Sequence, residues 1–296
     1  MQKRYRAAAT ALLLTATAGM AATGGAAEAS GTHHTSDRAA SKLVVTIKTK
    51  GGQIVLSDSK FRPGKTLFKV KPHGRGGDMQ VLRLKAGYSV GQAFSDVNAA
   101  FGGDVKAVRR VDRHIVFYGG TAMSPKGGAP NFWGVKIDKP GTYYVVNTDS
   151  NAITTFKVKG TMQKRHLPQA DGWINAVSIN HGAGNAFKAG KHNPKSGWMS
   201  TANKAKEPHF VDLGHVKKST SKKQVRKFFM SGAQNAPTFM AKDGAFFSTG
   251  IISPGKTFVW NYTLPRGRYL VDCFWPSKAD GTPHALMGMW KLTHLG

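Results

Sequence analysis

The chain contains a single cysteine, Cys273, among its 296 residues. One cysteine excludes an internal disulfide, and paired cysteines at zinc-binding spacing are absent as well. A lone cysteine in an exported protein is a metal ligand, a reactive thiol or one half of an intermolecular disulfide. The alternative is a small apolar residue of the core, because free cysteines are among the most buried side chains.

Acidic residues are also few: 15 Asp and Glu stand against 43 Lys and Arg, which gives a formal net charge of +28. So few carboxylates disfavour hydrolysis by a pair of acidic residues. The sequence shows neither a glycine-rich phosphate loop nor a Ser-His-Asp arrangement. The excess positive charge would attract anionic cell-surface polymers, lipid head groups or an acidic partner protein, and composition does not choose among them.

Long apolar runs are missing after the N-terminal segment, so no stretch reaches the roughly 20 residues of a membrane-spanning helix. Residues 1–29 begin with basic side chains, continue with an alanine-rich apolar run and end in Ala27-Glu28-Ala29. These are the regions of a secretory signal peptide, with cleavage expected after Ala29. We therefore predict a secreted, extracellular protein in which residues 30–42 form a disordered, polar lead-in.

The sequence from residue 43 onward predicts an all-β fold. Short runs rich in β-branched residues are separated by Gly, Pro, Asp and Ser, which is typical of a sandwich. In the first half, strands are predicted at 43–47, 53–56, 66–70, 79–84, 114–118, 132–137, 142–147 and 152–159. One helix interrupts them, because Ser89 can cap a segment whose apolar residues share one helical face as far as Phe101.

The same order recurs in the second half. Strands are predicted at 172–180, 197–202, 209–213, 245–252, 257–262, 268–274 and 285–294, with a helix at 221–230. The phrase Leu84-Lys-Ala-Gly-Tyr-Ser89 matches Val216-Lys-Lys-Ser-Thr-Ser221, and Pro140-Gly-Thr-Tyr-Tyr-Val145 matches Arg266-Gly-Arg-Tyr-Leu-Val271. We predict an internal duplication into domains 43–162 and 163–296, each a β-sandwich with one short helix.

Three side chains with donor atoms that favour copper follow one another closely near the end of the sequence. Cys273 is followed by ten residues and His284, and then by four residues and Met289. A thiolate, two imidazoles and a weak axial thioether form the blue-copper arrangement, which carries out one-electron transfer. The second imidazole is predicted to be His209, which directly follows Pro208, a residue whose ring fixes its own backbone φ angle. Met287 is a second candidate for the thioether, with less suitable spacing.

Together, these residues resemble the cupredoxin family, in which the first histidine follows an Asn-containing strand end. The Cys, His and Met of that family lie on the final strand pair and the loop between them, and the gap from His284 to Met289 is similar to that of plastocyanin. The resemblance implies two tandem Greek-key sandwiches and one type 1 copper ion, bound by His209, Cys273, His284 and Met289. The loop from Cys273 to His284 is longer than is usual in the family, so it must extend outward and return for both side chains to reach one ion.

The first half serves as an internal comparison. Aligning the two halves places Asn147 at the position of Cys273 and the glycine-rich residues 74–77 near His209, and nothing in 149–159 matches His284 or Met289. Ligands confined to one half favour a site over a packing requirement. Divergence of an old repeat without selection for metal is the alternative.

Two functions follow from these patterns: a copper protein for electron transfer or extracellular copper handling, and a metal-free module that holds anionic polymers or a partner protein. Nitrite reductases and multicopper oxidases, which the two-domain plan resembles, have histidines beside the type 1 cysteine. Here the neighbours are Asp272 and Phe274, so we do not predict an enzyme. His215 alone is a weak indication of a second metal site.

A basic patch is predicted around the second helix, suited to an acidic redox partner or an anionic polymer. A plain solvated helix face is the alternative. The patch comprises Lys217, Lys218, Lys222, Lys223, Arg226 and Lys227.

Overall fold

The computed structural model describes residues 42–50, 52–71, 79–121, 131–148, 150–179, 184–233 and 237–296. The predicted signal peptide and nearly all of the lead-in lie outside these residues, as do residues 74–77 of the internal comparison. Within this part of the chain, no helix combines the length and the apolar character needed to cross a membrane.

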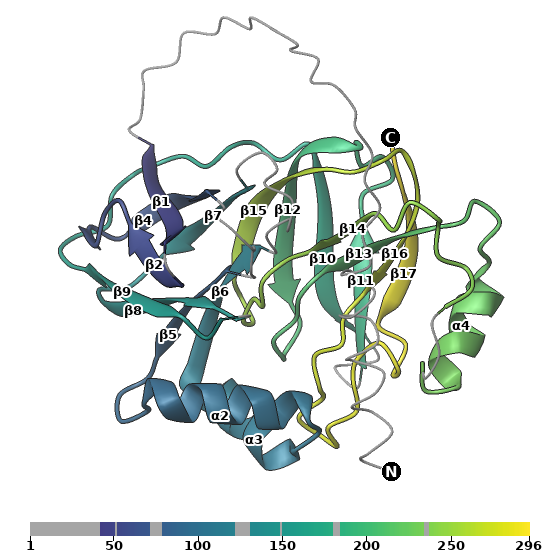
Figure 1. Ribbon diagram of the computed structural model, residues 1–296, viewed down its shortest axis with the longest axis horizontal. Helices are drawn as coiled ribbons and strands as arrows, with labels where there is room; N and C mark the ends of the chain where they lie inside the picture. Colours follow the sequence, from purple (N-terminus) through teal and green to yellow (C-terminus); the bar gives the residue numbers. More distant parts are fainter. Residues whose placement is uncertain are drawn as a thin grey trace, which may run out of the picture.

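One eight-stranded sheet runs through both halves of the chain (Figure 1). The halves meet where two strands pair antiparallel, with Phe258 opposite Val135 and Trp260 opposite Trp133. From edge to edge the strands are β11 (Gly184–Ala189), β10 (Gly172–Ile179), β12 (Ser196–Lys204), β15 (Thr257–Thr263), β7 (Asn131–Ile137), β4 (Gly64–Lys71), β1 (Leu43–Lys50) and β2 (Gln53–Leu56).

Each half adds a smaller sheet. The first consists of β3 (Lys60–Phe61), β9 (Ile153–Val158), β8 (Gly141–Asn147), β5 (Met79–Leu84) and β6 (Ile115–Thr121). The second consists of β14 (Phe246–Ser248), β13 (Asp212–Val216), β16 (Gly267–Asp272) and β17 (Trp290–Leu295). The predicted all-β sandwich class is confirmed.

Strand pairing follows the same plan in both halves. Strand β1 is parallel to β4 as β10 is to β12, and β4 is antiparallel to β7 as β12 is to β15. The small sheets correspond too, with the antiparallel series β5-β8-β9 matching β13-β16-β17. The division between residues 162 and 163 falls between β9 and β10 and stays a prediction.

The two predicted helices begin with the same capping interaction. In α2 (Val90–Phe101), Ser89 Oγ accepts from Gln92 N at 3.2 Å while the Gln92 side chain accepts from Ser89 N at 2.9 Å. In α4 (Lys222–Met230), Ser221 and Gln224 make the same pair of bonds at 3.2 and 2.7 Å. Each reciprocal pair satisfies backbone donors that a helix start leaves open.

A further helix, α3 (Val105–His114), was not predicted. Asp104 caps it by accepting from Lys106 N and Ala107 N, and it buries Val108 and Val111. β-branched valines have low helix propensity, and tertiary packing outweighs that preference here. Among the described residues, the prediction of one helix in each half is corrected to two in the first and one in the second.

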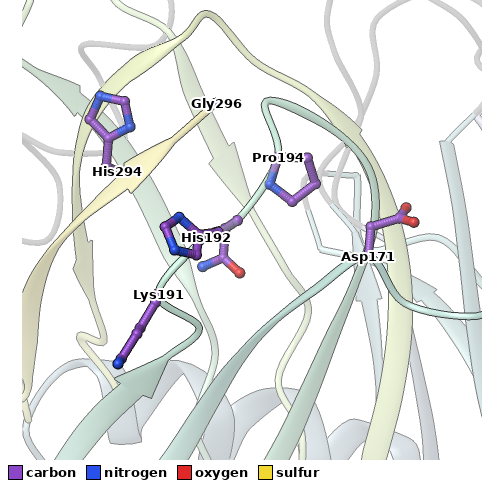
Figure 2. A pocket seen from close by; sticks show the side chains of 7 residues that line it. Asp171, Lys191, His192, Pro194, His294 and Gly296 are labelled. Carbon is purple, nitrogen blue, oxygen red and sulfur yellow. The ribbon is translucent and has the colours of Figure 1, made fainter.

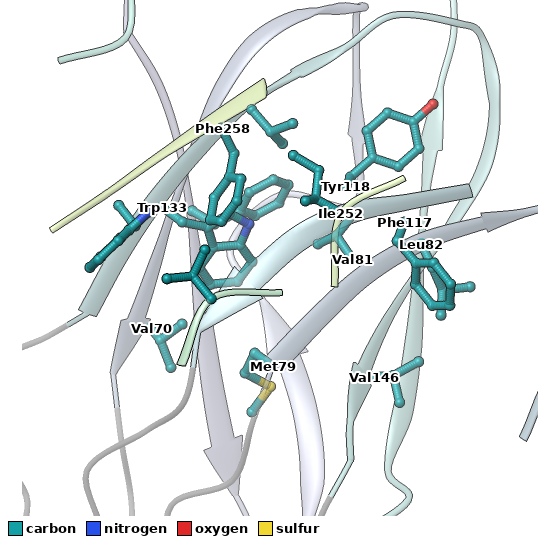
Figure 3. Close-up of a cluster of buried hydrophobic side chains, with 14 of the residues drawn as sticks. Val70, Met79, Val81, Leu82, Phe117, Tyr118, Trp133, Val146, Ile252 and Phe258 are labelled. Carbon is teal, nitrogen blue, oxygen red and sulfur yellow. The ribbon is translucent and has the colours of Figure 1, made fainter. Parts of the chain in front are cut away.

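The main core lies between the eight-stranded sheet and the smaller sheets and is built from both halves. Figure 3 shows Ile252 and Phe258 of the second half among Trp133 and Tyr118 of the first. Burial of such large side chains contributes roughly 1.5–3 kcal/mol each. Cys273 belongs to the same apolar cluster, so the candidate site is embedded in the core.

Candidate metal centre

Three of the predicted ligands come together in the second half. His209 Nδ1 lies 3.1 Å from His284 Nδ1 and 3.7 Å from Cys273 Sγ, and the three donor atoms all lie within 4.8 Å of one another. The side chains are 0%, 1% and 0% exposed, respectively. Among the described residues, no other group of three His, Cys, Asp or Glu side chains is close enough to hold a metal ion.

His209 is positioned by the segment before it and by a neighbouring loop. The buried Asn203 side-chain amide donates to the carbonyl groups of Glu207 and Ile252, at 2.8 and 2.9 Å. His209 N then donates to Ile252 O, and Ile252 N donates back to His209 O. The strand predicted at 209–213 begins only at Asp212, because His209 makes an isolated two-residue bridge instead of joining the ladder.

The long segment between Cys273 and His284 folds back as a hairpin. Ala285 N donates to Cys273 O at 2.8 Å, and His284 N donates to Trp275 O at 2.9 Å. Ser277 N donates to Thr282 O nearer the tip. The segment therefore extends outward and returns, as the sequence required, and it ends with both ligands side by side.

A turn follows His284 where the sequence predicted a strand at 285–294; β17 begins at Trp290. Met287 N and Met289 N both donate to His284 O, at 3.0 and 2.9 Å, which holds the chain in the turn. Met289 is 1% exposed and lies in the same apolar cluster as Cys273, whereas Met287 is 50% exposed. Burial favours Met289 over Met287, and Met289 stays a predicted axial ligand.

Glu207 fixes the orientation of His284. Its Oε2 lies 2.7 Å from His284 Nε2 and can accept a hydrogen bond from a proton on that nitrogen. In this tautomer, Nδ1 carries the lone pair that can bind a metal ion. Burial alone would raise the pKa of Glu207, but hydrogen bonding to His284 and the charges of His284 and Lys278 hold the pKa below its usual value. Histidine ligands of metals commonly donate their second N–H to a carboxylate in this way.

His209 and Cys273 both favour their neutral forms in this buried site. Burial, and the charge of His284, lower the pKa of His209 well below its usual value, and His209 Nε2 is a buried atom without a hydrogen-bond partner. Burial raises the pKa of the Cys273 thiol, although backbone hydrogen bonds at Phe210 and Trp275 act in the opposite direction. A neutral imidazole is the form that binds metal, and a bound cation would favour the thiolate.

The two donor distances at His209 are compatible with ligands of one metal ion. Two nitrogen ligands at about 2.0–2.1 Å from one centre are about 3–4 Å apart, and a sulfur ligand lies at about 2.3 Å from the same centre. The 3.1 Å and 3.7 Å distances at His209 fall in that range. Two imidazoles and a cysteine sulfur are the donor set of type 1 copper sites, with a thioether as the weak fourth ligand.

Helices of the first half contact the ligand hairpin of the second. Arg109 of α3 donates to Lys278 O at 2.9 Å and to Ala279 O at 3.3 Å, and Lys278 Nζ lies 3.2 Å from Asp112 Oδ2. Trp275 packs edge-on against Phe101 and Phe117, with ring centroids 5.3 and 5.9 Å apart. In Figure 1 the yellow hairpin reaches down to α2 and α3 at one end of the molecule. Because the hairpin is unusually long, it reaches the first half, whose side chains hold it in place.

The other histidines of the described segments do not form a second centre. His215, the weak candidate, has Nδ1 2.6 Å from Asp243 Oδ2 and stacks on Tyr269 with centroids 4.8 Å apart. His192 and His294 line a hollow of about 320 Å³ near the C-terminus, where Figure 2 shows them on separate segments. Neither belongs to a group of three potential metal ligands within the described part of the chain.

No protein-family model and no curated protein sequence matches the chain. Solved structures to which it is similar include auracyanin B (15% identity, 44% of this chain, 93% of that chain, TM-score 0.26). Another is the auracyanin of the photosynthetic bacterium Roseiflexus castenholzii (16% identity, 43% of this chain, 99% of that chain, TM-score 0.25). A third is the Cu-containing nitrite reductase of Thermus scotoductus (8% identity, 86% of this chain, 61% of that chain, TM-score 0.25). These neighbours are cupredoxins and cupredoxin-fold copper enzymes. All three TM-scores are below 0.5.

Proposed function

We propose that this chain is a secreted, cupredoxin-like protein that binds one type 1 copper ion for electron transfer or extracellular copper handling. The observation that supports the proposal is the convergence of His209, His284 and Cys273 donor atoms in a buried, soft-ligand site. A bound copper ion would supply one-electron chemistry by alternating between Cu(I) and Cu(II). The N-terminal signal sequence supports export.

The chain's own side chains would fix the coordination. His209 and His284 offer neutral ring nitrogens, Cys273 offers a thiolate, and Met289 offers the weak axial thioether. The hairpin hydrogen bonds and the Glu207 contact hold these donors in place before an ion arrives. Such preorganisation keeps the change in structure between two oxidation states small, which favours fast electron transfer.

We further propose that the protein is not an oxidase or nitrite reductase. Cys273 is flanked by Asp272 and Phe274, so neither neighbour supplies an imidazole for a second copper centre. Asp272 instead lies opposite Asp212 in the β13–β16 ladder. Burial, and the nearby Asp212 carboxyl, raise the pKa of Asp272, which favours its neutral form.

Copper titration of the mature chain tests this function. We expect one copper per chain by elemental analysis. We also expect an absorbance band at about 600 nm, which a thiolate–copper bond produces. Cys273→Ser should abolish the band. Met289→Leu and Met287→Leu form a matched pair: the first should shift the band, and the second should leave it unchanged.

The charge of the chain supports the alternative, a metal-free module that holds an anionic polymer. Strong retention on an anionic matrix, with neither a visible band nor bound copper after loading, would favour that module over the copper protein. Retention with a full copper complement would support the copper protein.

A further inference from the structure

A groove of about 880 Å³ lies between α4 and the chain that follows His284. Helix α4 contributes one wall, and the turn after His284 together with the start of β17 contributes the other. Its lining residues are Phe187, Lys222, Lys223, Arg226, Phe229, Met230, Leu286, Met287, Gly288, Trp290, Lys291 and Leu292.

The charges in this groove all have one sign. Lys222, Lys223 and Arg226 come from α4, Lys291 comes from β17, and none of the described lining residues is acidic. The three α4 cations are exposed. Such a surface attracts an anionic partner and speeds its association.

The groove also presents apolar side chains. Met230 and Met287 are 75% and 50% exposed, and Phe229 stacks on Trp290 with ring centroids 6.0 Å apart. Exposed apolar side chains grouped within a polar rim mark protein-binding surfaces. Methionine in particular adapts to the shape of a protein partner.

The groove also adjoins the candidate metal centre. Leu286, Met287 and Gly288 line it, and they connect His284 to the buried Met289. The carbonyl oxygen of His284 accepts from Met287 N within this turn. A partner seated in the groove would therefore touch the same short turn that carries two of the four predicted copper ligands.

We infer that the groove is the docking site for an acidic electron-transfer protein that presents apolar side chains within a ring of carboxylates. An anionic polymer would use the cations but leave the methionines uncovered, and a protein surface of this kind would use both. One electron would pass between the partner's redox centre and the copper ion, with no atom transferred, so that one is oxidised as the other is reduced. The electron-transfer part of this inference rests on the proposed function.

The test uses a fluorescein-labelled amphipathic helical peptide of Glu and Leu as the probe, titrated with the copper-loaded mature chain. Lys222→Glu, Lys223→Glu and Arg226→Glu together should weaken binding tenfold or more. The matched control changes three exposed lysines of β1 and β4 in the same way, Lys48→Glu, Lys50→Glu and Lys71→Glu, and should weaken binding less than threefold. Met230→Ser with Met287→Ser should weaken peptide binding about tenfold and leave binding of poly-glutamate unchanged.

Equal losses in the two triple variants would overturn the inference, because the attraction would then belong to the whole surface. If the peptide binds the methionine variant as tightly as the wild type, the groove would be a site for an anionic polymer and not for a protein. Binding to phosphatidylserine vesicles, lost in the α4 variant while the peptide fails to bind, would point to a membrane surface.

The visible copper band, measured in every variant, separates this test from that of the proposed function. A band that stays intact in the α4 variant while the peptide no longer binds would show that docking, and not copper binding, has failed. Groove-specific binding by a chain that takes up no copper would refute the copper function and leave the docking surface standing.

Discussion

Arg109 and Lys278 are 169 positions apart in the chain, and Arg109 Nε donates a 2.9 Å hydrogen bond to the Lys278 carbonyl oxygen. This bond joins a helix of the first half to the hairpin that carries Cys273 and His284. The first half, for which no ligands are predicted, thus supports the predicted ligands of the second half.

Replacing Arg109 by Ala should loosen the hairpin. Removing a group that holds a metal ligand in position, without itself touching the metal, typically lowers metal affinity by about 10–100-fold. We expect Arg109→Ala to weaken copper binding about tenfold in a chelator competition and to broaden the visible band. Arg113→Ala, which removes an exposed arginine of the same helix, is the control. The same loss in both variants would show that the total charge, and not the hairpin contact, sets the affinity.

Glu207 should contribute to copper affinity because it orients the His284 ring. In Glu207→Ala, His284 Nε2 loses the acceptor at 2.7 Å. Copper affinity should then fall about 10–100-fold. Glu207→Gln keeps an acceptor without the charge, so its loss should be less than tenfold. If the two substitutions cost the same, the contact would act through charge alone and not through orientation.

Gln80 should be a stability determinant, because it connects the halves next to the site. Its amide donates to Gly119 O and Ile251 O, and its Oε1 accepts from Ile251 N at 2.7 Å. Gln80→Leu removes the side-chain partners of Gly119 O and Ile251 N, whereas Ile251 O keeps its bond from Gly119 N, and the loss costs roughly 2–4 kcal/mol in the free energy of unfolding. Urea denaturation measures it. Gln169→Leu, at an exposed position, is the comparison and should cost less than about 0.5 kcal/mol.

Asp96 gives the stability a defined pH dependence. Its hydrogen bonds with Arg110, above all, lower the pKa of Asp96, although burial opposes the shift. A carboxyl group whose pKa is lower in the folded state stabilises fully above the unfolded pKa of about 3.9 and loses that contribution as the pH falls through the folded value. The urea midpoints of wild type and Asp96→Asn should therefore differ most at pH 6–7 and converge as the pH falls through the lowered pKa of Asp96 in the folded state.

The exposed Asp58 provides the control for this measurement. Asp58→Asn should leave the urea midpoint nearly unchanged across the same pH range. A constant gap between wild type and Asp96→Asn would show that the carboxylate charge does not stabilise the α2–α3 pair.

Features set by neighbouring residues could be predicted from the sequence. Ser89 and Ser221, each three residues before a glutamine, mark the starts of α2 and α4, and most strand positions follow from short β-branched runs. The approach of His209, Cys273 and His284 was predicted because their donor types and order resemble a known family. The valines of α3 hid this helix from prediction, because β-branched residues are enriched in strands and have low helix propensity.

Contacts between distant segments could not be predicted. Nothing local to Glu207 indicates that it meets His284, although it is one of only two glutamates in the chain. Nothing near Arg109 indicates that it meets a hairpin of the other half. The same holds for the pairing of β7 with β15, because a run of apolar residues does not specify which strand lies beside it.

The sheet shared by the two halves limits how the chain can lose one of them in evolution. If β7 and β15 were separated, each would become an open edge, and unpaired edges invite aggregation. Losing the first half would therefore expose β15 of the second half as an unpaired edge. Selection on solubility alone would preserve the first half, whatever it binds.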